Sequence, residues 1–384
     1  MKFLKSFFKY AIIIIGLLLI ILYVFDYDYM LKAMRTIYLN GHTTAFLEDY
    51  KEFDNHTISV AQAQPWPIHK DYNSVTETDQ LNQWNDRLGT ISYMIIKNDS
   101  IWFENYYDGF DKDSKSNSFS MAKSMISAML GKAIMEGKIS SLDQPVGDFF
   151  KEFSEGQAAQ LTVGDLSSMA SGLEWDESYY SPFSITTRAY FYDDLEKMML
   201  ELNVVGQPGE AYTYLSGNTQ LLGMVIEKAT GKTLSDYLSD SFWKPMGAEN
   251  EAFWQIDSED GQLEKAYCCV ASNARDFARF GKLYKDNGKW NGVQLLDSSF
   301  VNKSVNPRFE ESPQYGYGWW LLNHNDKNFF MMRGHLGQYV IVQPDDNVII
   351  VRLGHKNAKG PDPTILFSED IYGYIEEAYK MMSK

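Results

Sequence analysis

Ser120 and Lys123 are the two residues whose types and spacing best suit nucleophilic chemistry in this chain. They lie where a polar loop, residues 117–120, meets a run over 121–136 whose apolar residues recur at helical spacing. Residues three apart are neighbours on a helix, so the amine could take the hydroxyl proton once burial or a second cation lowers its pKa. The helix N-terminus would add partial positive charge where an oxyanion forms.

The Ser-x-x-Lys spacing is a weak signal by itself, because it also occurs at residues 6–9 and 241–244. The first copy lies beside an apolar N-terminal run, and the second lies in the last turn of a predicted helix. Only Ser120 has the loop-to-helix setting that the chemistry requires. The alternative interpretation of Ser120 is an N-cap serine followed by a solvent-facing lysine.

Two further segments carry residues that could complete such a site. Tyr214 precedes a predicted helix, and a tyrosine there could shuttle a proton between a serine, a lysine and a leaving group. The alternative is a tyrosine that packs beside an N-cap Ser216. In residues 333–338, Gly334 and Gly337 would let a substrate approach the backbone, and a following N–H could complete an oxyanion hole. The alternative there is a turn before an edge strand.

The elements that must position these residues are strands at both ends of the chain and helices between them. Strands are predicted at 89–96, 101–107, 316–322, 328–332, 338–342 and 348–353. Helices are predicted at 121–136, 162–169, 218–229, 233–244, 272–285 and 366–381, with Thr162 and Ser272 as caps. This order predicts an α+β fold, in which one antiparallel sheet from both chain ends is flanked by helices and interrupted by a helical insertion.

Residues 173–192 are crowded with aromatic side chains, among them Trp175 and Tyr179. Such a segment either forms the wall of a substrate cleft or covers part of the core, and the sequence favours neither.

Composition restricts the possible partners. The formal net charge of −16 argues against nucleic acid or an anionic membrane surface. The two cysteines, Cys268 and Cys269, are adjacent, which is neither a disulfide framework nor a metal-ligand spacing, so we expect two small buried side chains. The six histidines show no ligand pattern. We therefore expect no metal, and nothing in the sequence implies an organic cofactor.

The N-terminus predicts a membrane anchor. Lys2, Lys5 and Lys9 precede an apolar run over residues 10–25, and no small-residue cleavage site follows. We expect residues 1–25 to be an uncleaved signal anchor with a cytoplasmic N-terminus and the rest of the chain on the periplasmic or extracytoplasmic side.

The remaining chain divides into two parts. Residues 26–85 are predicted to be a connector that wraps the domain, and we assign them no chemistry. Residues 86–384 form the predicted catalytic domain. Its α/β part covers about 86–150 and 290–384, and its helical part covers about 151–289.

Taken together, the three segments resemble the penicillin-recognising serine hydrolases. Within them the chain is most similar to the class C β-lactamase-like branch, which includes 6-aminohexanoate-dimer hydrolases and esterases. The similarity runs from about Gly89 to Leu353 and includes residues 165–175 and 274–284. It implies a β-lactamase/transpeptidase-like fold.

The resemblance also implies residue roles. Ser120 would be the acylated nucleophile and Lys123 its proton acceptor. The tyrosine of the family's Tyr-x-Asn element stands seven residues before a Leu-Leu-Gly, which gives Tyr214 rather than Tyr212, with Ser216 where many relatives have asparagine. The oxyanion hole would consist of the backbone N–H groups of Ser120 and Gln338.

The family's Lys-Thr-Gly motif falls on residues 335–337, where this chain has His335, Leu336 and Gly337. Losing the lysine and threonine removes an expected clamp for a substrate carboxylate. His335 could still carry partial charge or donate a hydrogen bond. The expected substrate contacts are Ser216, His335, Gly337, Trp175 and Tyr179.

The resemblance favours a serine hydrolase that cleaves an amide or ester of a small molecule or short oligomer. The alternatives are a cell-wall D-Ala-D-Ala carboxypeptidase or weak β-lactamase, and a non-catalytic binding or sensor protein of the same fold.

Overall fold

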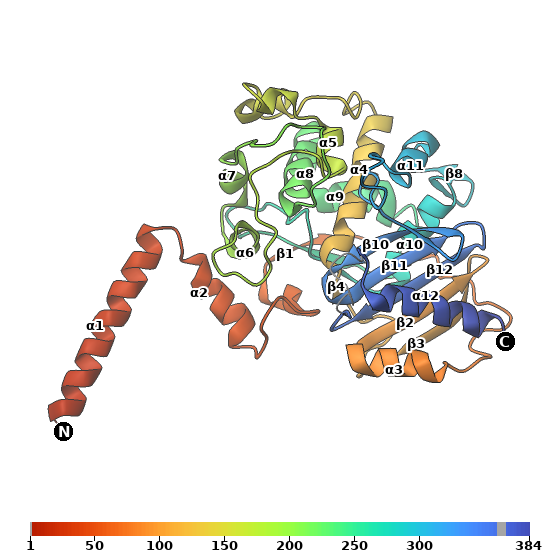
Figure 1. Ribbon diagram of the computed structural model, residues 1–384, viewed down its shortest axis with the longest axis horizontal. Coiled ribbons are helices and arrows are strands. Elements are labelled where there is room, and N and C mark those ends of the chain that lie inside the picture. Colours follow the sequence, from red (N-terminus) through yellow and green to blue (C-terminus); the bar gives the residue numbers. More distant parts are fainter. Residues whose placement is uncertain (1, 359–365) are drawn as a thin grey trace.

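The computed structural model describes residues 2–358 and 366–384 and contains a six-stranded antiparallel sheet, which lies at the lower right in Figure 1. The strand order is β3-β2-β12-β11-β10-β9. The strands are β2 (Thr90–Lys97), β3 (Ser100–Tyr106), β9 (Trp320–His324), β10 (Lys327–Gly334), β11 (Gln338–Gln343) and β12 (Val348–Gly354). Strands from both ends of the chain meet in this sheet, so the predicted α+β fold is confirmed.

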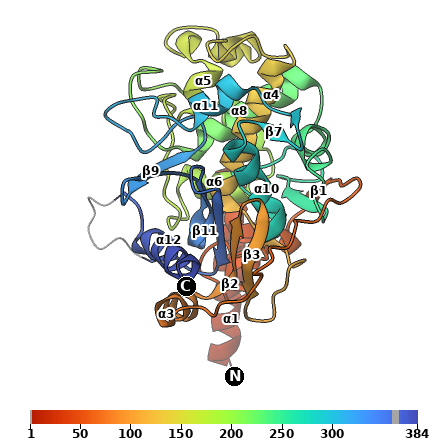
Figure 2. The ribbon, with the colours of Figure 1, turned by 90° about the vertical axis from the view of Figure 1, so that its right-hand side faces the viewer.

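Both faces of the sheet are covered, because successive side chains of a strand point to opposite faces. Ile350 packs in the cluster beneath α3 (Asp79–Leu88) and α12 (Glu369–Met382), which lie together in Figure 2. Its neighbour Ile349 packs on the other side, where α10 (Ala274–Lys285) contacts β11 and β12.

The helical part lies beyond the α10 face of the sheet, and α4 connects the two layers by contacting both β10 and α8 (Figure 1). Its helices are α4 (Ala122–Met135), α5 (Val163–Ser167), α6 (Ile185–Phe191), α7 (Leu195–Leu200), α8 (Ser216–Thr230), α9 (Leu234–Leu238) and α11 (Ser298–Ser304). Single turns complete it: η3 (Phe119–Met121), η4 (Val146–Asp148), η5 (Lys151–Phe153), η6 (Ala158–Gln160) and the π-helical η7 (Ser239–Trp243).

A second sheet has the order β1-β5-β6-β4. Its strands are β1 (Asn55–Ile58), β4 (Ser116–Asn117), β5 (Ala252–Gln255) and β6 (Val270–Ser272), and a separate ribbon joins β7 (Lys289–Trp290) to β8 (Val293–Gln294). The short pairing of β4 with β6 holds the residues just before Ser120 against the segment that follows Cys269.

The N-terminal elements are α1 (Lys2–Val24), α2 (Tyr29–Ala33), the π-helical turn η1 (Met34–Tyr38) and η2 (Asp49–Glu52). Helix α1 extends away from the rest of the molecule in Figure 1. Of the described residues, only the 22 from Phe3 to Val24 form a helix long and apolar enough to cross a membrane. At 1.5 Å per residue they span roughly 33 Å, about the thickness of a bilayer core.

Several predicted boundaries shift for identifiable reasons. The strand predicted at 316–322 begins only at Trp320, because the carbonyls of Tyr317 and Gly318 accept hydrogen bonds from hydroxyls of α4 instead of a strand partner. The cap of α10 is Asn273 rather than Ser272, since the Asn273 side chain accepts from the N–H of Asp276.

The final helix α12 starts at Glu369, later than the predicted 366, and ends at Met382. Thr162 caps α5 as predicted. Asp165 completes a reciprocal capping box with it.

Candidate active site

Ser120 lies in the single turn η3, directly before α4. The backbone that leads to it is tightly held: the N–H of Ser118 donates to the carbonyl of Val270 at 2.7 Å, and the N–H of Phe119 donates to the Asn117 side chain at 2.8 Å. Phe119 has a positive φ of 45°, which is uncommon for a non-glycine residue. These contacts place the Ser120 hydroxyl at the N-terminal end of a buried helix.

Lys123 is buried one turn further along, and its Nζ contacts three oxygens. They are Oγ of Ser120 at 3.0 Å, Oγ of Ser216 at 3.0 Å and the carbonyl oxygen of Tyr267 at 2.9 Å. Burial lowers the pKa of Lys123 to about 8, and the negative charge of Glu177 opposes that shift. Roughly a tenth of the amine is therefore neutral at pH 7, and the neutral fraction rises with pH.

The hydrogen-bond partners of Lys123 allow only one orientation of the two protons and the lone pair of the neutral amine. The Tyr267 carbonyl can only accept, and the Ser216 hydroxyl directs its own proton to Glu177 Oε1 at 2.6 Å, so it must also accept from Lys123. A neutral amine has two protons and one lone pair. Its lone pair therefore faces Ser120, in the position to take the hydroxyl proton.

Tyr214 lies on the other side of this group, with its ring centroid 5.2 Å from Lys123 Nζ and 5.2 Å from the ring of Trp320. Burial, reinforced by the negative charge of Glu177, raises the pKa of Tyr214 above the usual value for a phenol. Its hydroxyl is thus protonated at neutral pH and can act as a proton donor. Tyr212 and Tyr214 both pack against Tyr315, and of these two rings it is that of Tyr214 that lies over Lys123 Nζ. The choice of Tyr214 stays a prediction.

Glu177 is a residue that the sequence analysis missed. Its carboxylate accepts from the backbone N–H of Ser216 at 2.6 Å, from Trp175 Nε1 at 2.8 Å and from the Tyr179 hydroxyl at 2.5 Å. It lies in an irregular loop with no periodic pattern around it, so the sequence offers no signal that would separate it from a surface acid. In the structure it orients Ser216, and through Ser216 it orients Lys123.

The turn η8 (His335–Gly337) connects β10 to β11, and both strands contact the turn that carries Ser120. The side chain of Gln338 is buried and closes this turn, because its amide donates to the carbonyls of His335 and Gly354. The backbone N–H of Gln338 remains the predicted second donor of an oxyanion hole.

His335 stacks on the ring of Tyr179 with 5.5 Å between centroids. Burial lowers the pKa of His335 to about 4, so the ring is neutral at pH 7. Of the two roles expected for this side chain, hydrogen bonding is therefore favoured over charge.

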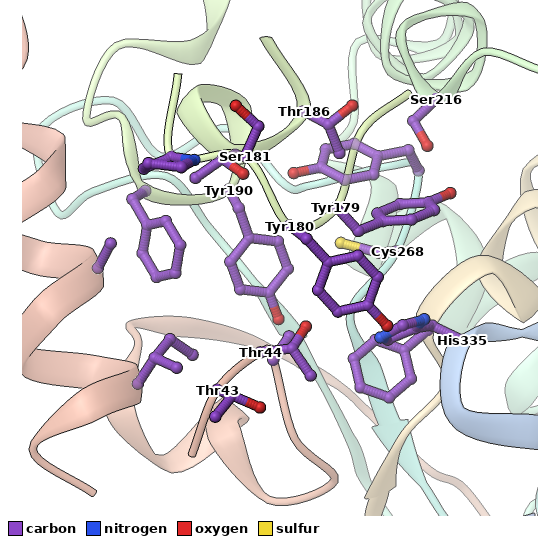
Figure 3. Close-up of a pocket in the computed structure, with 18 of the residues that line it drawn as sticks. Thr43, Thr44, Tyr179, Tyr180, Ser181, Thr186, Tyr190, Ser216, Cys268 and His335 are labelled. Carbon is purple, nitrogen blue, oxygen red and sulfur yellow. The ribbon is translucent and has the colours of Figure 1, made fainter. Parts of the chain in front are cut away.

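The other predicted substrate contacts separate into two groups. Tyr179, Ser216 and His335 line a hollow that reaches Ser120 (Figure 3). Trp175 is not among the residues that line this hollow; it packs on Gly217 and donates a hydrogen bond to Glu177. The expected substrate contact is therefore corrected: Trp175 supports the residues of the wall. Gly337 likewise faces away from the hollow toward Arg352: a Cβ there would meet Arg352 Nη1 at 2.3 Å.

The same hollow has walls that the sequence analysis did not anticipate. Ala33, Ile37 and Thr43 from the predicted connector line it, although no chemistry was assigned to that segment. A second hollow that also reaches Ser120 contains the cation Arg333. Arg333 is the first residue of the segment 333–338 considered in the sequence analysis, but a strand pattern alone does not indicate to which face of the sheet its side chain points.

The two cysteines require a correction. Cys268 and Cys269 were expected to be free buried side chains, and the structure instead bonds them to each other in a disulfide. Cys268 contributes to the wall of the hollow, next to the Tyr267 carbonyl that holds Lys123. Adjacent cysteines lie outside the spaced patterns from which disulfides are predicted.

The other Ser-x-x-Lys copies are accounted for by their surroundings. Ser241 lies in the π-helical turn η7, and Lys244 pairs with Asp240 at 2.8 Å. Ser6 and Lys9 belong to the apolar helix α1. Within residues 2–358 and 366–384, no group of three or more His, Cys, Asp or Glu side chains could hold a metal ion.

The chain is similar in sequence to a known family and to several known proteins. A family model described as Beta-lactamase matches residues 77–368. The 6-aminohexanoate-dimer hydrolase of Paenarthrobacter ureafaciens is 24% identical over 311 residues, which cover 75% of this chain and 77% of that protein. Protein flp of Staphylococcus aureus (strain COL) is 23% identical over 302 residues, 70% of this chain but only 60% of that longer protein.

Among solved structures, one from Bacillus anthracis that is provisionally named a 6-aminohexanoate-dimer hydrolase superposes with a TM-score of 0.69. It is 22% identical and covers 87% of this chain and 91% of its own. Likeness at this level of identity concerns the fold.

Proposed function

This chain belongs to the beta-lactamase family of serine hydrolases, and on that premise we propose that it cleaves an ester or amide bond through an acyl-enzyme on Ser120. The observation that carries the proposal is the set of three oxygens around Lys123, which directs the lone pair of the neutral amine at the Ser120 hydroxyl. An amine oriented in this way meets the geometric requirement for a general base.

In the proposed reaction, Lys123 takes the proton of Ser120 while Oγ attacks the substrate carbonyl. The backbone N–H groups of Ser120 and Gln338 stabilise the oxyanion. Tyr214 donates a proton to the departing alcohol or amine and regains one from Lys123. Water then attacks the acyl-enzyme by the same route in reverse, which releases the acid and restores Ser120.

The third segment bears on which carbonyl compounds react. His335 is neutral where many relatives have a lysine, which supports esters and amides without the β-lactam carboxylate as substrates. Arg333 is the observation that favours the second candidate, a cell-wall carboxypeptidase, because its cation could pair with a carboxylate on the leaving group.

An activity screen tests the proposal. Full-length protein and Ser120→Ala are incubated with short-chain nitrophenyl esters, aryl amides, a chromogenic cephalosporin and a D-Ala-D-Ala peptide. We expect turnover of esters or amides that Ser120→Ala abolishes. Turnover that the substitution leaves intact would place the chemistry elsewhere. Folded protein without turnover of any compound would favour a binding or sensor role.

We further propose that α1 anchors the chain in a membrane with the catalytic domain on the extracytoplasmic side. The length and apolar character of residues 3–24 support this. The basic residues Lys5 and Lys9 support the orientation.

A further inference from the structure

Ser120 lies where two hollows meet, and Tyr179 and His335 line both of them. We call one the Arg333 arm, because it continues along Glu177, Tyr214, Trp320, Arg333 and Asn357. We call the other the Ile37 arm, because it continues toward the N-terminal residues Ala33, Ile37, Thr43 and Thr44. A substrate whose carbonyl lies at Ser120 would extend one group into each arm.

The position of Tyr214 indicates which group enters which arm. A departing alkoxide or amine needs a proton, and Tyr214 is a protonated phenol whose ring centroid lies 5.2 Å from Lys123 Nζ, the amine that would return the proton to it. Tyr214 lines the Arg333 arm and is not among the residues that line the Ile37 arm. The leaving group therefore belongs in the Arg333 arm, and the acyl group belongs in the Ile37 arm.

The wall of the Ile37 arm is uncharged at neutral pH. No Asp, Glu, Lys or Arg is among the described residues that line it, and burial lowers the pKa of its one histidine, His335, to about 4. Two of its hydroxyls are already engaged inside the protein. Tyr190 donates to Asp49 at 2.6 Å, and Thr186 donates to the carbonyl of Asp176 at 2.6 Å.

The arm is also large enough for an alkyl chain. Its volume is about 120 Å³, roughly tenfold the space that a single water requires. Figure 3 shows Ser216, Tyr179 and His335 grouped at one end, with Thr43 further along beside the N-terminal segment. An uncharged hollow of this kind favours apolar groups, because each methylene that is buried strengthens binding by roughly fourfold.

Exposed apolar side chains surround the outer end of the Ile37 arm. Tyr38 and Leu39 are 63% and 76% exposed, and Tyr180 across the arm is 74% exposed. Phe183, 71% exposed, meets Tyr27 at 6.2 Å between ring centroids, just after α1. Apolar side chains therefore continue from α1 to the arm, which suits a substrate that is itself amphiphilic.

We propose that the Ile37 arm binds a linear apolar acyl chain, so that the preferred substrates are medium-chain fatty acyl esters or amides with a polar leaving group in the Arg333 arm. The inference rests on the proposed function. Ser120 Oγ bonds to the acyl carbon as the bond to the leaving group breaks, and the leaving group takes the Tyr214 proton. Water then cleaves the acyl–serine ester and releases the fatty acid.

The test compares nitrophenyl acetate, butyrate and octanoate, each below its micelle-forming concentration, with the full-length chain in nanodiscs. We expect wild-type kcat/KM for octanoate to exceed that for acetate by at least about tenfold. Ala33→Trp places an indole in the arm and should reduce octanoate turnover at least about tenfold while leaving acetate turnover within about twofold. Thr43→Trp, at an exposed residue that also lines the arm, is a second filling variant that folding should tolerate.

Met34→Trp is the matched control, because Met34 is adjacent to Ala33, half-exposed and outside the arm. It should change neither ester. Ser120-dependent hydrolysis without a chain-length preference, or with equal effects of all three tryptophans, would overturn this inference and leave the proposed function intact. Absence of any Ser120-dependent hydrolysis in folded protein would instead overturn the proposed function.

A second set of assays distinguishes the source of the acyl chain. The same variants are assayed with monomeric octanoyl glycerol and with a long-chain acyl glycerol in phosphatidylcholine vesicles. If the vesicle-borne ester is turned over faster and Ala33→Trp slows that turnover, the substrate is taken from a membrane. If the monomeric ester is turned over faster and Ala33→Trp slows that turnover, the substrate is dissolved. Insensitivity of both to Ala33→Trp would contradict the assignment of the arm.

Discussion

At the scale of single residues, the proposed reaction requires Lys123 to be neutral when it begins. Burial lowers the pKa of Lys123 to about 8, so the amine is mostly protonated below pH 8 and cannot accept the Ser120 proton. We therefore expect kcat/KM to rise with pH and to level off above a midpoint near 8. A pH–rate profile on a soluble ester measures this directly.

Lys123→Met should reduce kcat/KM by about 10²–10⁴-fold, the usual contribution of a positioned general base. Lys132→Met is its control, because Lys132 lies on the same helix and pairs with Glu136 at 3.6 Å. A Lys123→Met enzyme with near wild-type turnover and an unchanged pH profile would show that another group accepts the proton.

Glu177 provides a second prediction at this scale. Its charge raises the pKa of Lys123, against the larger effect of burial, so Glu177→Gln should lower that pKa further. The acid limb of the pH–rate profile should move down by roughly one pH unit. Glu174→Gln, on the exposed part of the same loop, should leave it in place. An upward shift in Glu177→Gln would contradict the sign of the interaction.

The sequence predicts some of these residues and not others for a physical reason. Ser120 lies in η3 and Lys123 follows three residues later in α4, so a helical continuation of this spacing predicts that they meet. Tyr214 follows only from the family resemblance, which places its tyrosine seven residues before a Leu-Leu-Gly. Glu177 reaches the site from a loop and Arg333 from the C-terminal end of β10. Neither position carries a periodic signal that would indicate where the side chain points.

At the scale of elements, the proposed oxyanion hole requires the turn η8 to hold its shape, because Gln338 directly follows this turn. Buried Arg352 fixes it, because Nη1 donates to the carbonyls of Leu336 and Gly337 at 3.0 and 2.8 Å, and Nη2 donates to the carbonyl of Leu88. The fold prediction from alternating strands was right, but which arginine pins which turn depends on contacts between distant segments.

Gly337→Ala tests this arrangement. Gly337 has φ of +84°, and its new Cβ would meet Arg352 Nη1 at 2.3 Å. Positive φ costs about 1–2 kcal/mol in a non-glycine residue, and disturbing hydrogen bonds of a buried guanidinium adds about 1.5–3 kcal/mol. We expect a total loss of roughly 3 kcal/mol or more in urea unfolding, together with loss of esterase activity.

Gly292→Ala separates the two effects, because Gly292 has φ of +83° and open space around its Cβ position. It should cost only the backbone contribution, roughly 1–2 kcal/mol, and leave activity unchanged. Equal destabilisation of both variants would mean that Arg352 does not hold the turn.

At the scale of the whole molecule, we propose that residues 1–25 anchor the chain and residues 86–384 carry the catalytic domain. The connector, residues 26–85, does more than join them, since Ile37 and Thr43 form part of the site wall. Its role could not be read from the sequence, because a mixed polar segment shows no pattern until the partner it packs against is known.

If α1 anchors the chain, the full-length protein should be found in the membrane fraction. Full-length protein should sediment with membranes, resist an alkaline carbonate wash and dissolve in detergent, because about 20 apolar residues hold a helix in a bilayer. Protease added to intact spheroplasts should digest the catalytic domain. A soluble exported protein whose N-terminus begins after residue 25 would show that α1 is a cleaved signal instead.

Covalent labelling shows whether Ser120 is the nucleophile and whether Lys123 activates it. Full-length protein is treated with a fluorophosphonate over a range of pH, and the adduct is located by peptide mass spectrometry. We expect one adduct, on Ser120, that forms faster as the pH rises through about 8 and is lost in Ser120→Ala. An adduct on another serine such as Ser241, or hydrolysis that persists while Ser120 stays unlabelled, would contradict this expectation.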